Sequence, residues 1–197
     1  MDNNFGRKCV QLARRSIEYF MHMQRKLSPV EVPEDKEFQE RKGVFVTLKN
    51  AEDNTLRGCI GFPEAIKPLW ETIMDSAINA AFNDPRFPAL TASELENILV
   101  EVSILTKPEE IKTEKKIIPS QIEIGKDGLI VERGNRSGLL LPDVAVEWKW
   151  NAEQFLEAAC QKAGLLAIAW RESRTKVYKF QTRAFVEEKP KGNVLEI

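Results

Sequence analysis

The chain has 197 residues, of which 43% are hydrophobic and 30% are charged, and its formal net charge is -1 with a pI of about 6.0. This composition is typical of a globular protein and argues against disorder, and the length fits one domain or two small lobes that share a core. The balanced charge argues against nucleic acid as a partner, because proteins that coat a duplex usually carry a basic excess.

The numbers of cysteine and histidine residues limit the kinds of site that the chain can form. Cys9, Cys59 and Cys160 are far apart, no CxxC pair is present, and His22 is the single histidine. These counts argue against a disulfide framework and against a multi-histidine metal site within one chain. The first residues are polar, and no stretch approaches the roughly 20 apolar residues that a membrane span requires. We therefore expect a cytoplasmic protein with free thiols, no membrane partner, no metal and no cofactor.

The first half of the chain alternates helices with strands. Val10, Ala13 and Ile17 recur at helical spacing, and His22 lies beyond this apolar stripe, where a solvated surface histidine is expected. Proline, glycine and capping residues bound the later elements. In chain order we predict a hairpin of 43–48 and 55–60, a helix from Pro68 to Asn83, a short helix beginning at Thr91, and a strand Ile98–Leu105.

The second half repeats this mixture. Residues 106–121 are rich in lysine and glutamate and are expected to form a linker or edge between lobes. We then predict a hairpin over 122–131, a helix from Asn151 to Gly164, and one long final strand over 177–186. Hairpins interspersed with a few helices favour an α+β fold, with mixed or mainly antiparallel sheets packed against helices in two layers.

The most concentrated signal is the hexapeptide Leu56-Arg57-Gly58-Cys59-Ile60-Gly61. In a regular strand, alternation places Arg57 and Cys59 on the same side, where the cation would lower the pKa of the thiol from its reference of about 8.5. This pattern indicates a reactive thiol or an anion pocket. The alternative is a small buried cysteine in a bulged strand, with the arginine paired to a carboxylate.

The two glycines of the hexapeptide and a later loop are the remaining candidates. We expect Gly58 to give close access to the site and Gly61 to serve backbone conformation at the turn into Pro63. Asp84-Pro85-Arg86 places opposite charges on either side of a proline. It is consistent either with a helix stop closed by an ion pair or with the lining of a pocket.

The hexapeptide is identical to the signature of the AMMECR family, and the resemblance extends over nearly the whole chain. Matching segments occur at 77–90, 124–129, 137–142 and 160–165, so residues 5–190 are assigned to an AMMECR-type domain. Ala89 and Asp143 depart from the usual pattern. The resemblance implies a two-lobed fold whose larger lobe uses both chain ends and whose smaller lobe comes from the middle.

The family has no settled reaction, so the resemblance transfers no catalytic residue. Its members are found fused to, or encoded beside, Memo-like and radical-SAM proteins, which implies a modification pathway. We predict a small-molecule or peptide site formed by Arg57, Gly58, Cys59, Gly61, Asp84 and Arg86. If the protein is an enzyme, Cys59 assisted by Arg57 is the best catalytic candidate. The alternative is a non-catalytic adaptor that uses the same patch to dock a partner protein.

Overall fold

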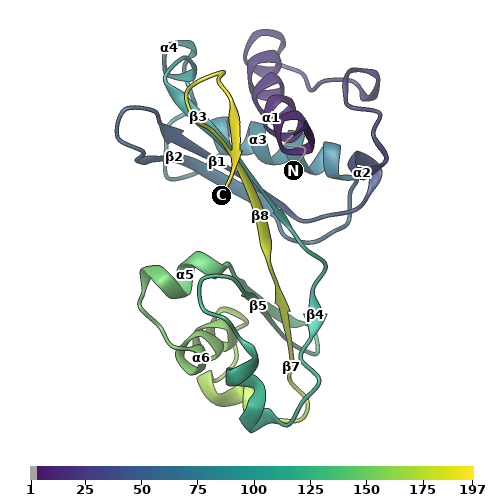
Figure 1. Ribbon diagram of the computed structural model, residues 1–197, viewed down its shortest axis with the longest axis vertical. Helices are drawn as coiled ribbons and strands as arrows, with labels where there is room; N and C mark the ends of the chain where they lie inside the picture. Colours follow the sequence, from purple (N-terminus) through teal and green to yellow (C-terminus); the bar gives the residue numbers. More distant parts are fainter. Residues whose placement is uncertain (1–3) are drawn as a thin grey trace. The chain divides into compact units, whose positions relative to one another are not determined.

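The computed structural model describes residues 4–197, and the chain forms two compact units (Figure 1). Unit 1 contains the chain up to Leu105 together with Arg183–Ile197, and unit 2 contains Thr106–Thr182. Each unit combines a β-sheet with helices, so the predicted α+β class is confirmed.

Unit 1 is built on a five-stranded sheet with the order β2-β1-β3-β8-β9. Its strands are β1 Val44–Asn50, β2 Leu56–Phe62, β3 Ile98–Leu105, β8 Thr182–Glu187 and β9 Val194–Glu196. Its helices are α1 Asn4–Met23, η1 Pro29–Glu31, α2 Lys36–Gln39, α3 Leu69–Phe82 and α4 Ala92–Leu95. The long helices α1 and α3 contact each other and pack on the sheet (Figure 1).

The core of unit 1 follows from strand alternation. Val44, Val46 and Leu48 of β1 are completely buried, while the residues between them are partly exposed. Because successive side chains point to opposite faces, these residues form one apolar face, which packs against the buried stripes of α1 and α3. The other face of the sheet carries the polar side chains of β1 and β2, among them Thr47 and Cys59.

Unit 2 has a four-stranded sheet with the order β4-β7-β5-β6. Its strands are β4 Glu109–Glu110, β5 Gly128–Arg133, β6 Arg136–Leu140 and β7 Lys176–Phe180. Its helices are η2 Lys115–Gln121, α5 Pro142–Glu147, α6 Ala152–Lys162 and η3 Ala167–Arg171. Phe155 and Leu156 of α6, with Trp170 of η3, fill its core against Leu129 and Val177.

Several predicted elements are confirmed where a capping or stop signal fixed the boundary. Strand β3 has the predicted bounds, and α3 ends before Asn83 as expected. Helix α4 begins with the capping box of Thr91 and Glu94, and α6 begins with the equivalent box of Asn151 and Gln154. These signals are local hydrogen bonds, so the sequence alone locates them.

The predicted hairpin over 122–131 is wrong. Residues 122–127 form a turn rather than a strand, because the Asp127 carboxylate accepts the Glu123 N–H at 2.9 Å and the Asp127 N–H returns to the Glu123 carbonyl. Asp127 is almost fully buried, which locks this turn. The hairpin lies one segment later, where β5 and β6 pair across Gly134 and Asn135.

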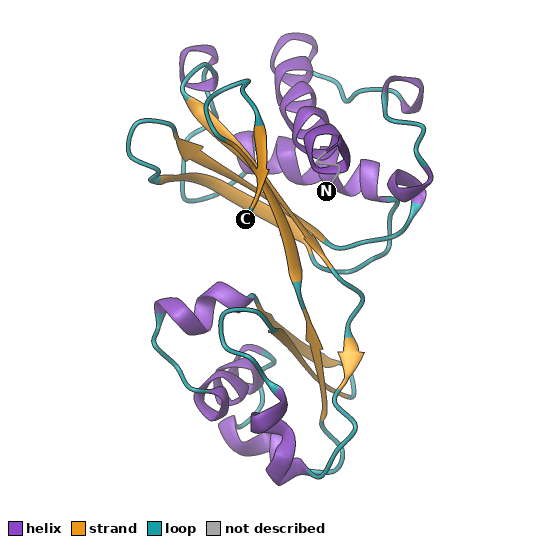
Figure 2. Cartoon of the chain, in the orientation of Figure 1, coloured by secondary structure: helices purple, strands orange, loops and turns teal. Residues whose placement is uncertain are grey.

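The predicted single strand over 177–186 is also wrong, because two strands of different sheets occupy this segment (Figure 2). Gln181 separates β7 from β8. Its N–H donates to the Thr106 hydroxyl and its carbonyl accepts the Thr106 N–H, both at 2.8 Å. A side-chain acceptor thus replaces a ladder partner at this one residue and ends the strand. The expected linker 106–121 contains β4 and η2.

Candidate functional site

The hexapeptide forms most of β2, which is an edge strand of the unit 1 sheet. Its register against β1 pairs Gly58 with Leu48 but Leu56 with Lys49, so Arg57 is the extra residue of a β-bulge. The expectation that Arg57 and Cys59 share one face of a regular strand is therefore wrong. The bulge shifts the alternation, so Leu56 and Cys59 pair with residues on one face of β1 and Arg57 turns to the edge.

Arg57 reaches from the edge of β2 to the loop between α3 and α4. Its Nε donates to Glu94 Oε1 at 2.8 Å and its Nη2 to the Pro88 carbonyl at 3.0 Å. The guanidinium is 5.7 Å from the ring centre of Phe87, and only 8% of the side chain is exposed. The hydrogen bond from Arg57 lowers the pKa of Glu94 to about 2. Arg57 therefore anchors this loop, as the second interpretation of the hexapeptide predicted.

A second arginine reaches in the opposite direction. Arg86 Nη2 donates to the Cys59 carbonyl at 3.1 Å, and Asp84 Oδ2 accepts the Cys59 N–H at 2.8 Å. Arg86 and Asp84 also bind each other through two bonds of 2.7 and 3.0 Å. We call these two residues the Asp84–Arg86 clasp. It occupies the backbone groups of the edge strand at Cys59, where a neighbouring strand would otherwise bind.

The two members of the clasp differ in exposure. The Asp84 side chain is 2% exposed and that of Arg86 is 53% exposed. The guanidinium of Arg86, followed by the hydrogen bond from Cys59, holds the pKa of Asp84 well below its ordinary value. The ion pair thus forms as the helix-stop interpretation predicted, and it leaves one face of a fixed guanidinium open to solvent. The Phe87 ring lies within 6 Å of both Arg57 and Arg86.

Cys59 is half-buried, and its sulfur accepts the Thr47 hydroxyl at 3.3 Å. The expected lowering of its pKa is wrong, since burial raises the pKa of the thiol above its ordinary value despite the hydrogen bond from Thr47 and the nearby Arg86. Arg57 does not assist because its charge is paired with Glu94. Within residues 4–197 no hydrogen bond joins Cys59 to His22, which is exposed in the last turn of α1.

The hexapeptide glycines both allow close packing. A Cβ on Gly58 would lie 2.2 Å from the Ala80 carbonyl oxygen, so α3 of the same chain takes the space that we expected to give access to the site. A Cβ on Gly61 would lie 2.3 Å from the Phe45 ring and 2.5 Å from the Val44 carbonyl oxygen. The φ of Gly61 is not positive, so its expected conformational role is wrong.

The sequence did not indicate the partners of these residues. Thr47 became identifiable only once the hairpin register was known, because it is the cross-strand neighbour of Cys59. Glu94 was recognised as a capping residue, but its second oxygen holds Arg57. Phe87 follows Arg86 directly, and no local pattern indicates that a ring will lie beside two guanidinium groups.

The chemistry available here is recognition more than proton transfer. Asp84 is saturated by donors, Glu94 is paired, and the thiol is neutral near pH 7. Among residues 4–197 no group of three or more His, Cys, Asp or Glu is placed to hold a metal ion. In the same part of the chain, no helix has both the length and the apolar character to cross a membrane.

Comparison with known proteins gives matches over almost the entire chain. The AMMECR1 family model matches residues 10–185. A protein of Pyrococcus furiosus is 48% identical over 98% of this chain and 92% of its own length, and one of Methanopyrus kandleri is 47% identical over 97% and 92%. A crystal structure of an uncharacterised Pyrococcus horikoshii protein is 46% identical, with a TM-score of 0.84 and coverage of 98% of this chain and 96% of that one.

Proposed function

Because the chain belongs to the AMMECR1 family, we propose that its hexapeptide strand and the Asp84–Arg86 clasp form a binding site for a peptide or small molecule that carries a carboxylate. The observation that carries this proposal is the Arg86 guanidinium, which is fixed by Asp84 yet half-exposed. A guanidinium held in place loses little freedom when it binds a carboxylate, which suits recognition.

Three features of the surrounding surface support this assignment. Thr47 and the Lys49–Glu101 pair lie on the same face of the sheet as Cys59, which gives the ligand further polar contacts. Leu56 is 40% exposed at the start of the strand and offers an apolar contact. The bulge and the close approach of Gly58 to α3 make the strand rigid, so the site is formed before the ligand arrives.

A cysteine-nucleophile enzyme is less well supported by the same geometry. A nucleophilic cysteine needs thiolate, and the pKa of Cys59 is raised by burial. In our proposal Cys59 therefore contributes its backbone and a neutral thiol to the site. The family resemblance implies a modification pathway with Memo-like and radical-SAM proteins, in which this chain would act as the enzyme, the substrate carrier or an adaptor.

The second candidate is an adaptor that docks a folded partner on the same surface. It is favoured by exposed apolar side chains at both ends of β2, since Phe62 is 42% exposed and Leu56 40%. An adaptor needs both ends of the strand, whereas a carboxylate site needs chiefly Arg86. Phe62→Ser and Arg86→Gln therefore separate the two functions.

The test is selection of short peptides with free C-terminal carboxylates from a random library, followed by NMR mapping on the labelled protein. Our proposal predicts shifts at Cys59 and Arg86, weaker binding by the amidated peptides, and roughly tenfold weaker binding by Arg86→Gln. Arg136→Gln in unit 2 is the matched control. Peptides that bind equally as amides, or that bind Arg86→Gln as well as the unmodified chain, would count against the carboxylate site.

A further inference from the structure

A hollow lies in unit 1 between α1 and the turn that joins β8 to β9. Its volume is about 450 Å³, within the range of small-molecule sites. One stripe of α1 forms one wall, including Lys8, Leu12 and Arg15, and Lys191 and Val194 lie on the opposite wall. None of the hexapeptide or clasp residues lines it, so a ligand bound in this hollow is independent of the proposed function.

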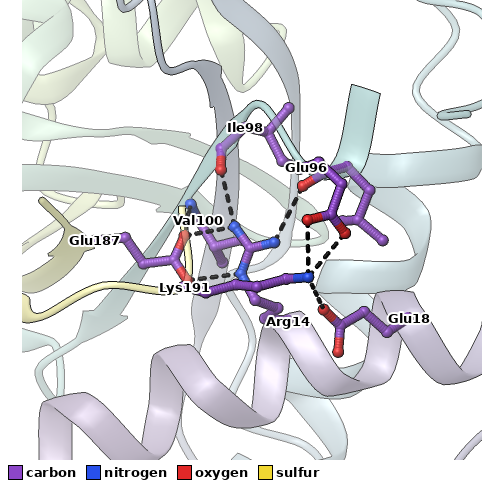
Figure 3. A network of polar contacts seen from close by, with 8 residues as sticks. Arg14, Glu18, Glu96, Ile98, Val100, Glu187 and Lys191 are labelled. Atoms are coloured by element: carbon purple, nitrogen blue, oxygen red, sulfur yellow. Dashed lines mark hydrogen bonds and ion pairs between the residues drawn. The ribbon is translucent and has the colours of Figure 1, made fainter. Parts of the chain in front are cut away.

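The floor of this hollow is a buried ion pair (Figure 3). Arg14 Nε and Nη2 each donate to the Glu187 carboxylate at 2.6 Å, and Nη2 also donates to the Ile98 carbonyl at 2.8 Å. The Val100 N–H also donates to the Glu187 carboxylate, at 3.0 Å. The floor is therefore rigid and electrically neutral, and the charges at the rim decide which ligand the hollow accepts.

The rim is cationic. Lys8, Arg15 and Lys191 line the hollow, whereas Glu18 is, among the lining residues within 4–197, the one carboxylate apart from Glu187. Arg15 is exposed, and no hydrogen bond or ion pair joins it to residues 4–197, although its charge lies near enough to Glu31 to help lower the pKa of that carboxyl. Arg15 therefore keeps its full donor capacity for a ligand.

The two lysines of the rim already have carboxylate partners. Lys8 pairs with Asp35 at 2.9 Å, and Lys191 pairs with Glu96 at 2.7 Å and lies 3.8 Å from Glu18 (Figure 3). Neither Asp35 nor Glu96 contributes to the wall. An anion inside the hollow therefore meets Lys8 from the side that Asp35 leaves open, whereas at Lys191 it shares the ammonium group with Glu18, 3.8 Å away in the lining.

The backbone of Lys191 supports a built arrangement. Its φ is 61°, a left-handed conformation that side chains other than glycine seldom adopt, and Gly192 follows it in a turn closed onto Lys189. Strain of this kind persists where surrounding contacts impose it, often at ligand sites. The Lys191 Nζ lies between Glu96 on one side and Glu18 on the other (Figure 3).

We propose that this hollow binds a small organic anion, a carboxylate or phosphate ester attached to an apolar body. The cationic rim receives the acid group, chiefly at Arg15 and Lys191. The apolar part packs against Leu12, Pro33 and Val194, which line the same space. Both acid groups accept hydrogen bonds from arginine and lysine, so the experiment distinguishes them by direct comparison.

Isothermal titration with octanoate, phenyl phosphate and inorganic phosphate tests the acid group, and octanamide and octylamine are the matched uncharged and cationic probes. We expect octanoate or phenyl phosphate to bind, and octanamide and octylamine to bind at least tenfold more weakly. Arg15→Gln and Lys191→Gln should each weaken binding by roughly tenfold. Gln11→Trp, which fills the hollow from an exposed position, should abolish it.

The controls locate the site. Lys162→Gln, an exposed cation of unit 2, should leave affinity unchanged, and Arg86→Gln should do the same because it belongs to the hexapeptide site. Equal binding of octanoate and octanamide would overturn the proposal, as would affinity that survives both rim variants. Loss of binding in Arg86→Gln alone would assign the anion to the hexapeptide and remove it from this hollow. Absence of heat with all three anions would also overturn it.

Discussion

Two of the arginine–carboxylate pairs of unit 1 differ in what surrounds them. Arg14 and Glu187 are 173 residues apart in sequence, and their side chains are 6% and 4% exposed. Asp84 and Arg86 are two residues apart, and the carboxylate is 2% exposed whereas the guanidinium is 53% exposed. Both pairs are bidentate, and both also bind backbone groups of a strand.

The difference separates a structural role from a recognition role. In the Arg14–Glu187 pair every charged atom faces another protein group, so the pair connects α1 to β3 and β8. In the clasp the carboxylate is fully used by the protein, and the cation is fixed but open to solvent. The first pair should therefore govern stability, and the second should affect stability less and ligand binding more.

The largest loss of stability is expected for Arg14→Ala. It leaves the Glu187 carboxylate buried without its cation, which typically costs about 3–5 kcal/mol. Urea unfolding at pH 7 measures the loss. The double variant Arg14→Met with Glu187→Leu should recover most of it, because apolar residues of similar volume replace both charges. A loss below about 1 kcal/mol for Arg14→Ala would remove the distinction between the two pairs.

The next largest loss of stability is expected for Gly58→Ala, which tests how rigid β2 is next to the clasp. The new methyl would lie 2.2 Å from the Ala80 carbonyl oxygen, a backbone atom that moves only if α3 moves. We expect a loss of up to about 3 kcal/mol from overpacking. Gly61→Ala should cost less, because its nearest contact is the ring of half-buried Phe45 and its backbone contact, the Val44 carbonyl oxygen, is at 2.5 Å rather than 2.2 Å. Thermal melts of both variants decide the order, and a greater loss for Gly61→Ala would show that the ring cannot move.

Asp84→Asn should have an intermediate effect on stability. The amide keeps the shape but removes the charge that binds Arg86 and the Cys59 N–H, a loss of about 2 kcal/mol. Arg86 is half-exposed, so water satisfies its guanidinium, and the loss should stay below that of Arg14→Ala. Chemical unfolding of the two variants under one set of conditions makes the comparison. Equal losses would mean that exposure of the cation does not matter.

The smallest effect is expected for the Arg57–Glu94 pair, whose carboxylate side chain is 39% exposed. The pKa of Glu94 is lowered from 4.5 to about 2. A depressed acid stabilises the fold above its unfolded pKa, so this contribution is present above about pH 4.5 and is lost as the pH falls toward 2. Glu94→Gln should cost about 1 kcal/mol at pH 7, because solvent screens the exposed Glu94 side chain and the amide oxygen of glutamine still accepts from the buried Arg57 Nε. A difference from the unmodified chain that persists at pH 2 would assign the effect to lost capping.

The sequence located the features that depend on neighbouring residues. Capping boxes, proline stops and apolar periodicity gave α1, α3, α4, α6 and β3, and the spacing of Asp84 and Arg86 indicated an ion pair. The sequence did not locate features that depend on distant partners. The bulge at Arg57 changes which side chains share a face, and a single pair of contacts to Thr106 ends a strand at Gln181.

The same limit explains the errors at Cys59. The neighbouring Arg57 in the sequence suggested that Cys59 would be a thiolate, but Arg57 is hydrogen-bonded to Glu94, 37 residues away. The cation that does lie near the sulfur, Arg86, is neutralised by Asp84. Charge balance at one atom depends on every group that surrounds it, and only tertiary structure supplies that set.

The long separation of Arg14 and Glu187 has a consequence for synthesis of the chain on the ribosome. Translation proceeds at roughly 5–20 residues per second, so α1 emerges many seconds before the carboxylate that neutralises it. Unit 2, whose residues are contiguous, is complete before β8 is made. Synthesis of unit 1 therefore begins first and ends last. Until Glu187 has been synthesised, the charge of Arg14 must be solvated by water or bound by a chaperone.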